Sequence, residues 1–97
     1  MIVRIMAEGQ YRLDEGHHAK LDELDDLVVA RVEAGDEPGY TTAFSELLSF
    51  VRETGEPLSS DDLEGSDFML PPADLSFTEA GDEFTGEGLI PDPPAAA

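Results

Sequence analysis

Two neighbouring histidines stand among carboxylates near the start of an expected helix. His18 and Asp22 are four residues apart, so on a helix they share one face and could together hold a metal ion. The spacing is not that of an H-E-x-x-H zinc motif, and the chain holds 23 Asp and Glu residues, so a carboxylate near a histidine is expected by chance. We therefore expect His17 and His18 to form a solvated helix start and not a metal site.

Two clusters of carboxylates are the other candidates for chemistry. They consist of Asp22, Glu23, Asp25 and Asp26, and of Asp61, Asp62, Glu64 and Asp67. A catalytic carboxylate pair needs a cleft that separates the two pKa values, whereas the first cluster flanks an apolar helix stripe and is expected to be solvated. The second cluster lacks the glycine and the spacing of a calcium loop. We therefore expect no catalytic residues, no metal and no cofactor; a carboxylate-based hydrolase has no motif to support it.

Length and composition narrow the class of protein further. A chain of 97 residues forms one small domain, which buries about 60–65% of its unfolded surface. A net charge of −18 argues against binding nucleic acid directly and against docking directly on anionic lipid. The absence of cysteine excludes disulfides and thiolate chemistry. No apolar run is long enough for a membrane span or a secretory signal, so we expect a soluble cytoplasmic protein.

The charge is distributed unevenly along the chain. Residues 1–13 carry a net charge of +1, residues 14–53 carry −8, and residues 54–97 hold 11 acidic residues and no basic one. Such a surface repels itself at low salt, and the repulsion largely disappears near 1 M salt, where the Debye length is about 3 Å. The acidity therefore predicts either adaptation to a cytoplasm of molar salt or a binding face for a basic partner, and the two are compatible.

The first half of the chain predicts a strand hairpin followed by a helix hairpin. Residues 1–13 are expected to form two short strands around a turn at 7–10. Apolar residues at helical spacing predict one helix between Asp14 and Gly35 and a second from Pro38 to Gly55, joined by a short link. The first strand is apolar on nearly both faces. It must therefore be covered by the helices, by another strand or by another chain, and an exposed edge could accept a partner strand.

The second half predicts little regular structure. Residues 59–67 are expected to be an acidic loop, and residues 68–70 an edge strand or a packed extended segment that ends at two prolines. Ser76 and Glu79 form a capping box for a last helix that ends near Phe84. Residues 89–90 are expected to return to the core. We therefore predict one acidic α+β domain over residues 1–90, in which a β-hairpin packs on an antiparallel helix pair and a loop-rich segment with one short helix follows. Residues 91–97 are expected to be a flexible tail.

Five stretches of the sequence resemble one known family. They are M-I-V-R-I-M-A-E-G-Q-Y-R-L-D at 1–14, L-D-E-L-D-D-L at 21–27, V-R-E-T-G-E-P-L at 51–58, S-D-F-M-L-P-P-A-D at 66–74 and G-L-I-P-D at 88–92. Together they are similar to the PspA-associated protein family, and the resemblance extends over nearly the whole chain. One departure is the last helix, residues 76–84, which a glycine interrupts here and which tends to be more apolar in the family.

The resemblance implies a role in the phage-shock, or envelope-stress, system. PspA is a mostly helical coiled-coil protein that coats and mends stressed membrane. Its associated protein would be a non-enzymatic cytoplasmic adaptor or regulator that reaches the inner face of the membrane only through PspA. No catalytic residues are carried over from the family.

The N-terminal segment is the expected contact surface, with Arg4, Gly9, Tyr11 and Arg12 as its candidate residues. This segment carries both the family-like run and the only local positive charge in the chain. The alternative is an acidic mimic of nucleic acid, or another inhibitory protein, that occupies the basic groove of a DNA-binding protein. The sequence leaves open whether the chain is a monomer or a homodimer that buries the hairpin.

Overall fold

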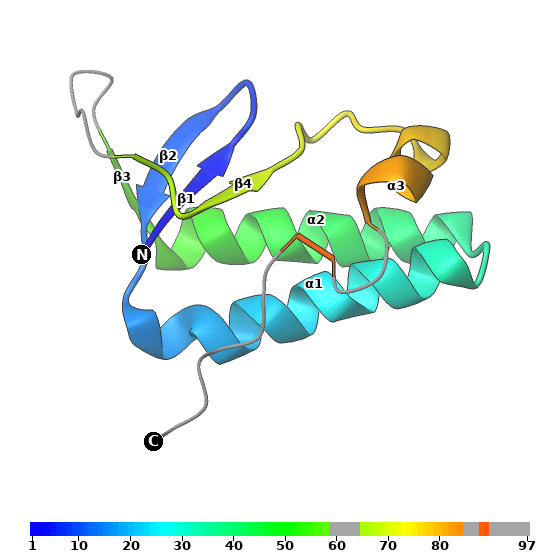
Figure 1. Ribbon diagram of the computed structural model, residues 1–97, viewed down its shortest axis with the longest axis horizontal. Coiled ribbons are helices and arrows are strands. Elements are labelled where there is room, and N and C mark those ends of the chain that lie inside the picture. Colours follow the sequence, from blue (N-terminus) through cyan, green and yellow to red (C-terminus); the bar gives the residue numbers. More distant parts are fainter. Residues whose placement is uncertain (59–64, 85–87, 90–97) are drawn as a thin grey trace.

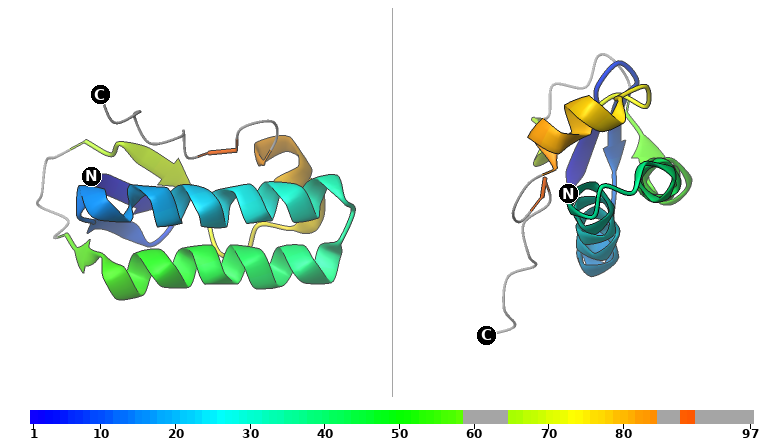
Figure 2. Two further views of the ribbon diagram at one scale, coloured as in Figure 1. Left: turned by 90° about the horizontal axis from the view of Figure 1, so that it is seen from below. Right: turned by 90° about the vertical axis from the view of Figure 1, so that its right-hand side faces the viewer.

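The computed structural model describes residues 1–58, 65–84 and 88–89, and their elements form two layers (Figure 1). One layer is an antiparallel pair of long helices, α1 (His18–Glu33) and α2 (Glu37–Thr54). The other layer holds a four-stranded sheet over one end of the helix pair and the short helix α3 (Phe77–Glu83) over the other end (Figures 1 and 2). The predicted α+β class is confirmed. The predicted tail, residues 91–97, lies outside the described residues.

The sheet has the strand order β3-β2-β1-β4 and contains both parallel and antiparallel pairs. The predicted hairpin is its centre, where β1 (Ile2–Ile5) and β2 (Gly9–Arg12) run antiparallel. The edge strand expected at 68–70 is present as β4 (Phe68–Leu70), which pairs parallel to β1. The two-residue strand β3 (Glu56–Pro57) pairs antiparallel to β2 and was not predicted.

Strand β1 is central in the sheet, so the structure decides among the coverings that the sequence left open: the helices and other strands of this chain cover the hairpin, and the alternative of an exposed hairpin edge is not found in the described part of the chain. The hairpin edge along β1 is occupied by β4 and the edge along β2 by β3, both from the same chain. The outer edges of the described sheet are therefore strands of two and three residues. Edge strands this short offer few free hydrogen-bonding groups to another chain.

Local signals account for the ends of the helices. The Asp14 carboxylate accepts a hydrogen bond from Gly16 N–H and caps a single 3-10 turn, Glu15–His17, from which α1 continues. Gly35 follows the last turn of α1, and the Asp36 carboxylate accepts from Gly39 N–H at 3.1 Å to begin α2. These caps satisfy backbone N–H groups that have no partner within the helix. The two helices are consequently joined by a very short turn, as predicted.

The core lies between the sheet and the helix pair. From the sheet, Val3, Ile5 and Leu70 are completely buried, and they meet the apolar stripes of α1 and α2. The buried stripe residues are Leu21, Leu24, Val28 and Val29 on α1 and Tyr40, Ala43, Phe44, Leu47, Leu48 and Val51 on α2. Since side chains alternate along a strand, the odd-numbered residues of β1 face this core and the even-numbered residues face away from it.

Helix α3 covers the other end of the helix pair despite the glycine within it. The predicted capping box is present, with Ser76 Oγ accepting from Glu79 N–H and the Glu79 carboxylate accepting from Ser76 N–H. Phe84 directly follows this helix, is completely buried and packs edge-on against Phe44 of α2 with ring centroids 5.6 Å apart. Gly81 faces open space, so it leaves no gap in this packing.

Candidate functional site

The candidate residues Arg4 and Arg12 share the sheet face that points away from the helices. Arg4 pairs with Gln10 across the hairpin and with Met69 of β4, and Arg12 pairs with Ile2 and Glu56. Both arginines are exposed. Because Arg4 and Arg12 are diagonal neighbours on adjacent strands, their long side chains can act on one partner together.

The other two candidate residues do not join this face. Tyr11 is opposite Val3 on the helix-facing side, where it is half-buried and packs against the core. Gly9 pairs with Ile5 and has a φ of +137°, a conformation that L side chains rarely adopt. The structure therefore brings two of the four predicted residues together and gives Tyr11 and Gly9 positions that serve the fold.

Part of the outer sheet face is covered by the chain itself. Ile2 N–H donates to the Asp67 carboxylate at 2.8 Å, and Gln10 Nε2 donates to Ser66 Oγ at 2.9 Å. Ile2 and Gln10 are consequently buried, although they are on the outer side of the hairpin. Arg4 and Arg12 remain exposed on this face and are open to a partner.

Two methionines that the sequence did not single out lie beside Arg4. Met69 is 52% exposed and Met6 is 46% exposed, and these are the exposed large hydrophobic side chains of the described residues. Met69 is the direct neighbour of Arg4 on β4, and Met6 N–H donates to Leu70 O at 3.0 Å, so all three belong to one end of the sheet. For Met6 the sequence did hold a signal, since strand alternation places residues 4 and 6 on the same face. The pairing of β4, more than 60 residues away in the chain, was not readable.

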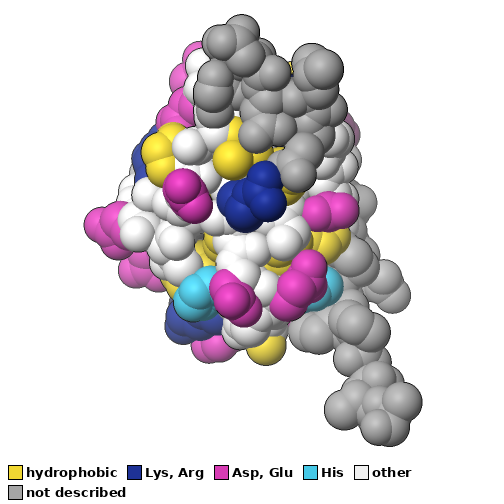
Figure 3. Space-filling model, turned by 90° about the vertical axis from the view of Figure 1, so that its left-hand side faces the viewer, with side chains coloured by type: hydrophobic (Ala, Val, Ile, Leu, Met, Phe, Trp, Pro, Cys, Tyr) yellow, Lys and Arg dark blue, Asp and Glu magenta, His cyan; other side chains and the backbone are white. Residues whose placement is uncertain are grey.

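The end of the molecule that carries the N-terminus presents charged and hydrophobic side chains side by side (Figure 3). On the face drawn in Figure 3, a basic side chain lies near the centre, and acidic side chains are spaced separately around it. These carboxylates do not form a continuous row on this face. A mimic of nucleic acid would need carboxylates in rows at phosphate-like spacing.

The two histidines belong to the packing of the helix start. His18 is buried, and its ring lies 5.3 Å from the ring of Phe68 on β4. His17 packs edge-on against Phe50 of α2, with ring centroids 5.9 Å apart. The expectation that this pair is solvated is therefore wrong for His18, because β4 covers it.

The carboxylates of α1 are also less exposed than predicted. Asp25 is completely buried and Asp22 nearly so, whereas Asp26 is exposed. Oxygens of these three carboxylates lie within 4.8 Å of one another, a spacing that a cation could bridge. However, both oxygens of Asp25 accept hydrogen bonds from Leu89 N–H, at 3.2 and 3.0 Å. Asp25 therefore holds Leu89 against α1, which is a structural role.

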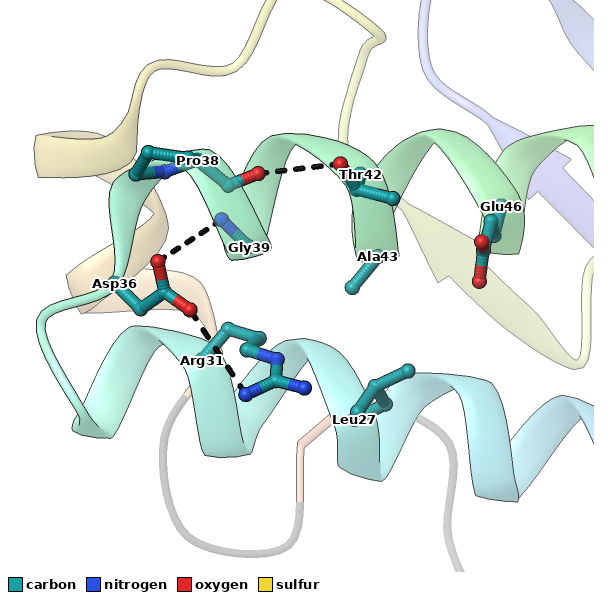
Figure 4. Close-up of a pocket in the computed structure, with 8 residues that line it drawn as sticks. All are labelled: Leu27, Arg31, Asp36, Pro38, Gly39, Thr42, Ala43 and Glu46. Atoms are coloured by element: carbon teal, nitrogen blue, oxygen red, sulfur yellow. Dashed lines mark hydrogen bonds and ion pairs between the residues drawn. The ribbon is translucent and has the colours of Figure 1, made fainter.

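A hollow of ≈ 460 Å³ lies between α1 and α2 near their connecting turn (Figure 4). Arg31 Nη1 is 3.8 Å from the Asp36 carboxylate, and the same carboxylate caps α2 through Gly39 N–H. Thr42 Oγ1 donates to the backbone carbonyl of Pro38. Arg31, Asp36, Gly39, Pro38 and Thr42 are thus engaged in contacts that hold the helix turn together.

One ion pair connects the hairpin turn to α2. Arg52 donates hydrogen bonds from Nε to Glu8 Oε2 at 3.0 Å and from Nη2 to Glu8 Oε1. The hydrogen bond from Arg52 lowers the pKa of Glu8, and partial burial opposes this effect. On the same helix, Tyr40 Oη donates to Leu75 O at 2.8 Å, and burial followed by the nearby charge of Glu79 raises the pKa of Tyr40. Both contacts fix the position of the sheet end that carries Met6 and Met69.

The site therefore belongs to a small two-layer α+β protein that presents an arginine beside two exposed methionines at one end of its sheet. Within the described part of the chain, no helix combines the length and apolar character needed to cross a membrane. The family model of the PspA-associated proteins matches residues 1–92, and the chain belongs to that family. No curated protein and no solved structure matches the chain.

Proposed function

We propose that this protein is a non-enzymatic adaptor that binds a PspA-like protein and modulates its assembly. The family supports association with PspA, since its members are described as PspA-associated proteins. In this proposal the protein acts in the cytoplasm and meets the membrane only through its partner.

The observation that carries the proposal is the exposed position of Arg4 on the outer sheet face. Arg4 forms no ion pair with any described residue, although the chain has 23 acidic residues and only 5 basic ones. Its register neighbour Met69 is one of the exposed large hydrophobics. Arginine and methionine are enriched in protein interfaces, because they combine a charge or a flexible shape with a large apolar contact.

The test is a charge reversal on this face. We expect the double variant Arg4→Glu, Arg12→Glu to bind a purified PspA-like protein at least about tenfold more weakly than the unaltered chain, a loss of about 1.4 kcal/mol. Binding is measured by isothermal titration calorimetry at about 0.15 M and about 1 M salt. The loss is expected to be larger at the lower salt concentration, where charges are less screened.

A matched control separates this surface from a general effect of charge. Lys20 is exposed on α1, outside the sheet, and pairs with Glu23. Lys20→Glu makes the same change of charge as Arg4→Glu and should leave the affinity within about twofold. Circular dichroism of each variant checks the fold. Unchanged affinity of the folded double variant would remove this surface from the proposal.

The unaltered chain tests the function itself. Affinity capture from native cells, in buffer matched to cytoplasmic salt, should yield a PspA-like protein as the main partner. Capture dominated by DNA-binding proteins that DNA then displaces would instead support the nucleic-acid mimic and overturn the adaptor function.

A further inference from the structure

A hollow of ≈ 430 Å³ lies between the exposed end of the sheet and helix α3. Met69 and Leu70 contribute from β4, and Met6 contributes from the turn after β1. Leu75, from the loop after β4, and Leu89 complete the apolar lining. Glu79 and Glu83 line it from α3. The sheet and α3 are neighbours in the same layer over the helix pair (Figure 1).

The apolar lining of this groove fits apolar side chains of a partner. Leu70 is completely buried, Leu75 is half-buried, and the two methionines are about half exposed. Unbranched methionine side chains adapt their shape to what they contact and are frequent on surfaces that receive helices. The volume is in the range of sites that enclose several apolar groups.

Charges of opposite sign flank the groove. Glu79 and Glu83 are one helical turn apart, exposed on α3 and on the same side of that helix. Arg4 is beside Met69 at the sheet side. A segment that lies in the groove would therefore meet carboxylates along one flank and a guanidinium along the other.

The strand geometry argues against an extended peptide as the occupant. β4 has three residues and is followed directly by Pro71 and Pro72, which have no backbone N–H to donate. A partner strand could therefore form only a very short ladder at this position. A helix satisfies its own backbone hydrogen bonds and needs only an apolar stripe that matches the groove.

We propose that this groove is the binding site for an amphipathic helix of the protein's partner. The helix carries an apolar stripe that contacts Met6 and Met69, basic residues that face Glu79 and Glu83, and an acidic residue that faces Arg4. The inference rests on the proposed function, because it identifies which part of the PspA-like partner the adaptor binds and where.

The first experiment compares two substitutions at one position. Met69→Glu places a charge in the apolar contact and should weaken binding of the purified PspA-like protein by about tenfold or more. Met69→Leu keeps the apolar area and should stay within about twofold. Glu83→Lys should also weaken binding, and more strongly at about 0.15 M than at about 1 M salt. Its control, Glu46→Lys, reverses an exposed charge on α2 outside this groove and should have no such effect.

The second experiment identifies the occupant directly. A photo-crosslinking amino acid at position 6 of the full chain, mixed with the PspA-like protein, should give cross-links that recur every three or four residues along one partner segment. That spacing is the signature of one helix face. Cross-links to alternate residues of an extended segment, or to a second copy of this chain, would overturn the inference.

The outcomes separate the inference from the function on which it rests. If the unaltered chain binds the PspA-like protein and Met69→Glu binds equally well, the groove is not the binding site of the partner helix, while the adaptor function stands. If the unaltered chain does not bind, the proposed function fails and the inference fails with it. Loss of binding by Met69→Glu with retention by Met69→Leu supports both.

Discussion

The carboxylate of Asp25 shows how a single residue can be given its role by a distant part of the chain. It is completely buried on α1, and both its oxygens accept hydrogen bonds from Leu89 N–H, 64 positions further on. A buried carboxylate is costly unless hydrogen bonds satisfy it. Gly88 approaches the same carboxylate so closely that a Cβ atom there would lie 2.3 Å from Oδ2, and its φ is +80°. The position of the Asp25 carboxylate therefore leaves no room for a side chain at residue 88.

Replacing Gly88 tests this close contact. We expect Gly88→Ala to lower the free energy of unfolding by about 1–3 kcal/mol, because the new methyl group collides with Asp25 and the backbone conformation is strained. The control is Gly81→Ala in α3, where a Cβ would face open space. That change should raise stability by about 0.5–1 kcal/mol, since alanine favours a helix. Urea unfolding of both variants at about 1 M salt measures the difference. Equal effects of the two changes would contradict a close contact at Gly88.

At the scale of elements, the sequence predicted what local signals encode and missed what distant pairing decides. The hairpin, the helix pair and α3 were predictable because caps and apolar spacing act over a few residues, as the capping box at Ser76 shows. The pairing of β4 with β1 was not predictable, because it joins segments more than 60 residues apart. The same pairing buries His18 and brings Met69 beside Arg4. The burial of Asp25 was missed for the equivalent reason, since Leu89 covers it.

The candidate site was predicted in part for the same physical reason. Arg4 and Arg12 were found because charge composition is visible in the sequence. Side chains alternate along a strand, so the bounds and register of β1 and β2 place Arg4 and Arg12 on one face and Tyr11 on the other. The groove beside α3 could not be predicted, because segments distant in sequence build it, from Met6 to Leu89.

The ion pair between the hairpin turn and α2 predicts a pH dependence. Arg52 lowers the pKa of Glu8 below its ordinary value of 4.5, so the folded state holds the ionised form more strongly than the unfolded chain does. The resulting stabilisation is fully present above pH 4.5 and is lost as the pH falls through the lower pKa of the folded state. Because both side chains are about one-third exposed, solvent limits the contribution to about 0.5–1 kcal/mol.

We therefore expect Glu8→Gln to be slightly less stable than the unaltered chain at pH 7, and the difference to shrink as the pH falls below 4.5 and through the lower pKa of folded Glu8. Thermal unfolding at matched ionic strength across this range measures it. Arg52→Gln should remove the same stabilisation, and the double variant should be little less stable than either single variant. Additive losses in the double variant would show that Glu8 and Arg52 act separately.

At the scale of the whole molecule, the fold places a strongly acidic surface around a small two-layer core. The described ion pairs of Arg52, Lys20 and Arg31 neutralise few of the 23 acidic residues. Mutual repulsion among the remaining carboxylates opposes the compact state, and its range shortens as salt is added. The apolar core, in contrast, does not depend on screening of this kind. Electrostatic repulsion is therefore the term that salt should change most between about 0.1 M and 1 M.

The salt response of two charge reversals tests whether repulsion sets the stability of this molecule. Glu33 is exposed in the last turn of α1, where the negative end of the helix dipole opposes its charge, and Glu37 is exposed in the first turn of α2, where the dipole favours it. Glu33→Lys should stabilise the protein by about 0.3–1 kcal/mol near 0.1 M salt, and Glu37→Lys should gain less, because it relieves repulsion but loses the dipole interaction. Both gains should fade near 1 M potassium chloride, where the unaltered chain should itself become more stable. If its melting temperature does not change with salt, repulsion is not limiting, and the acidity is better explained as a face for basic partners. A melting temperature that rises with salt and levels off near 1 M, together with the fading gain of Glu33→Lys, would instead explain the acidity as adaptation to concentrated salt.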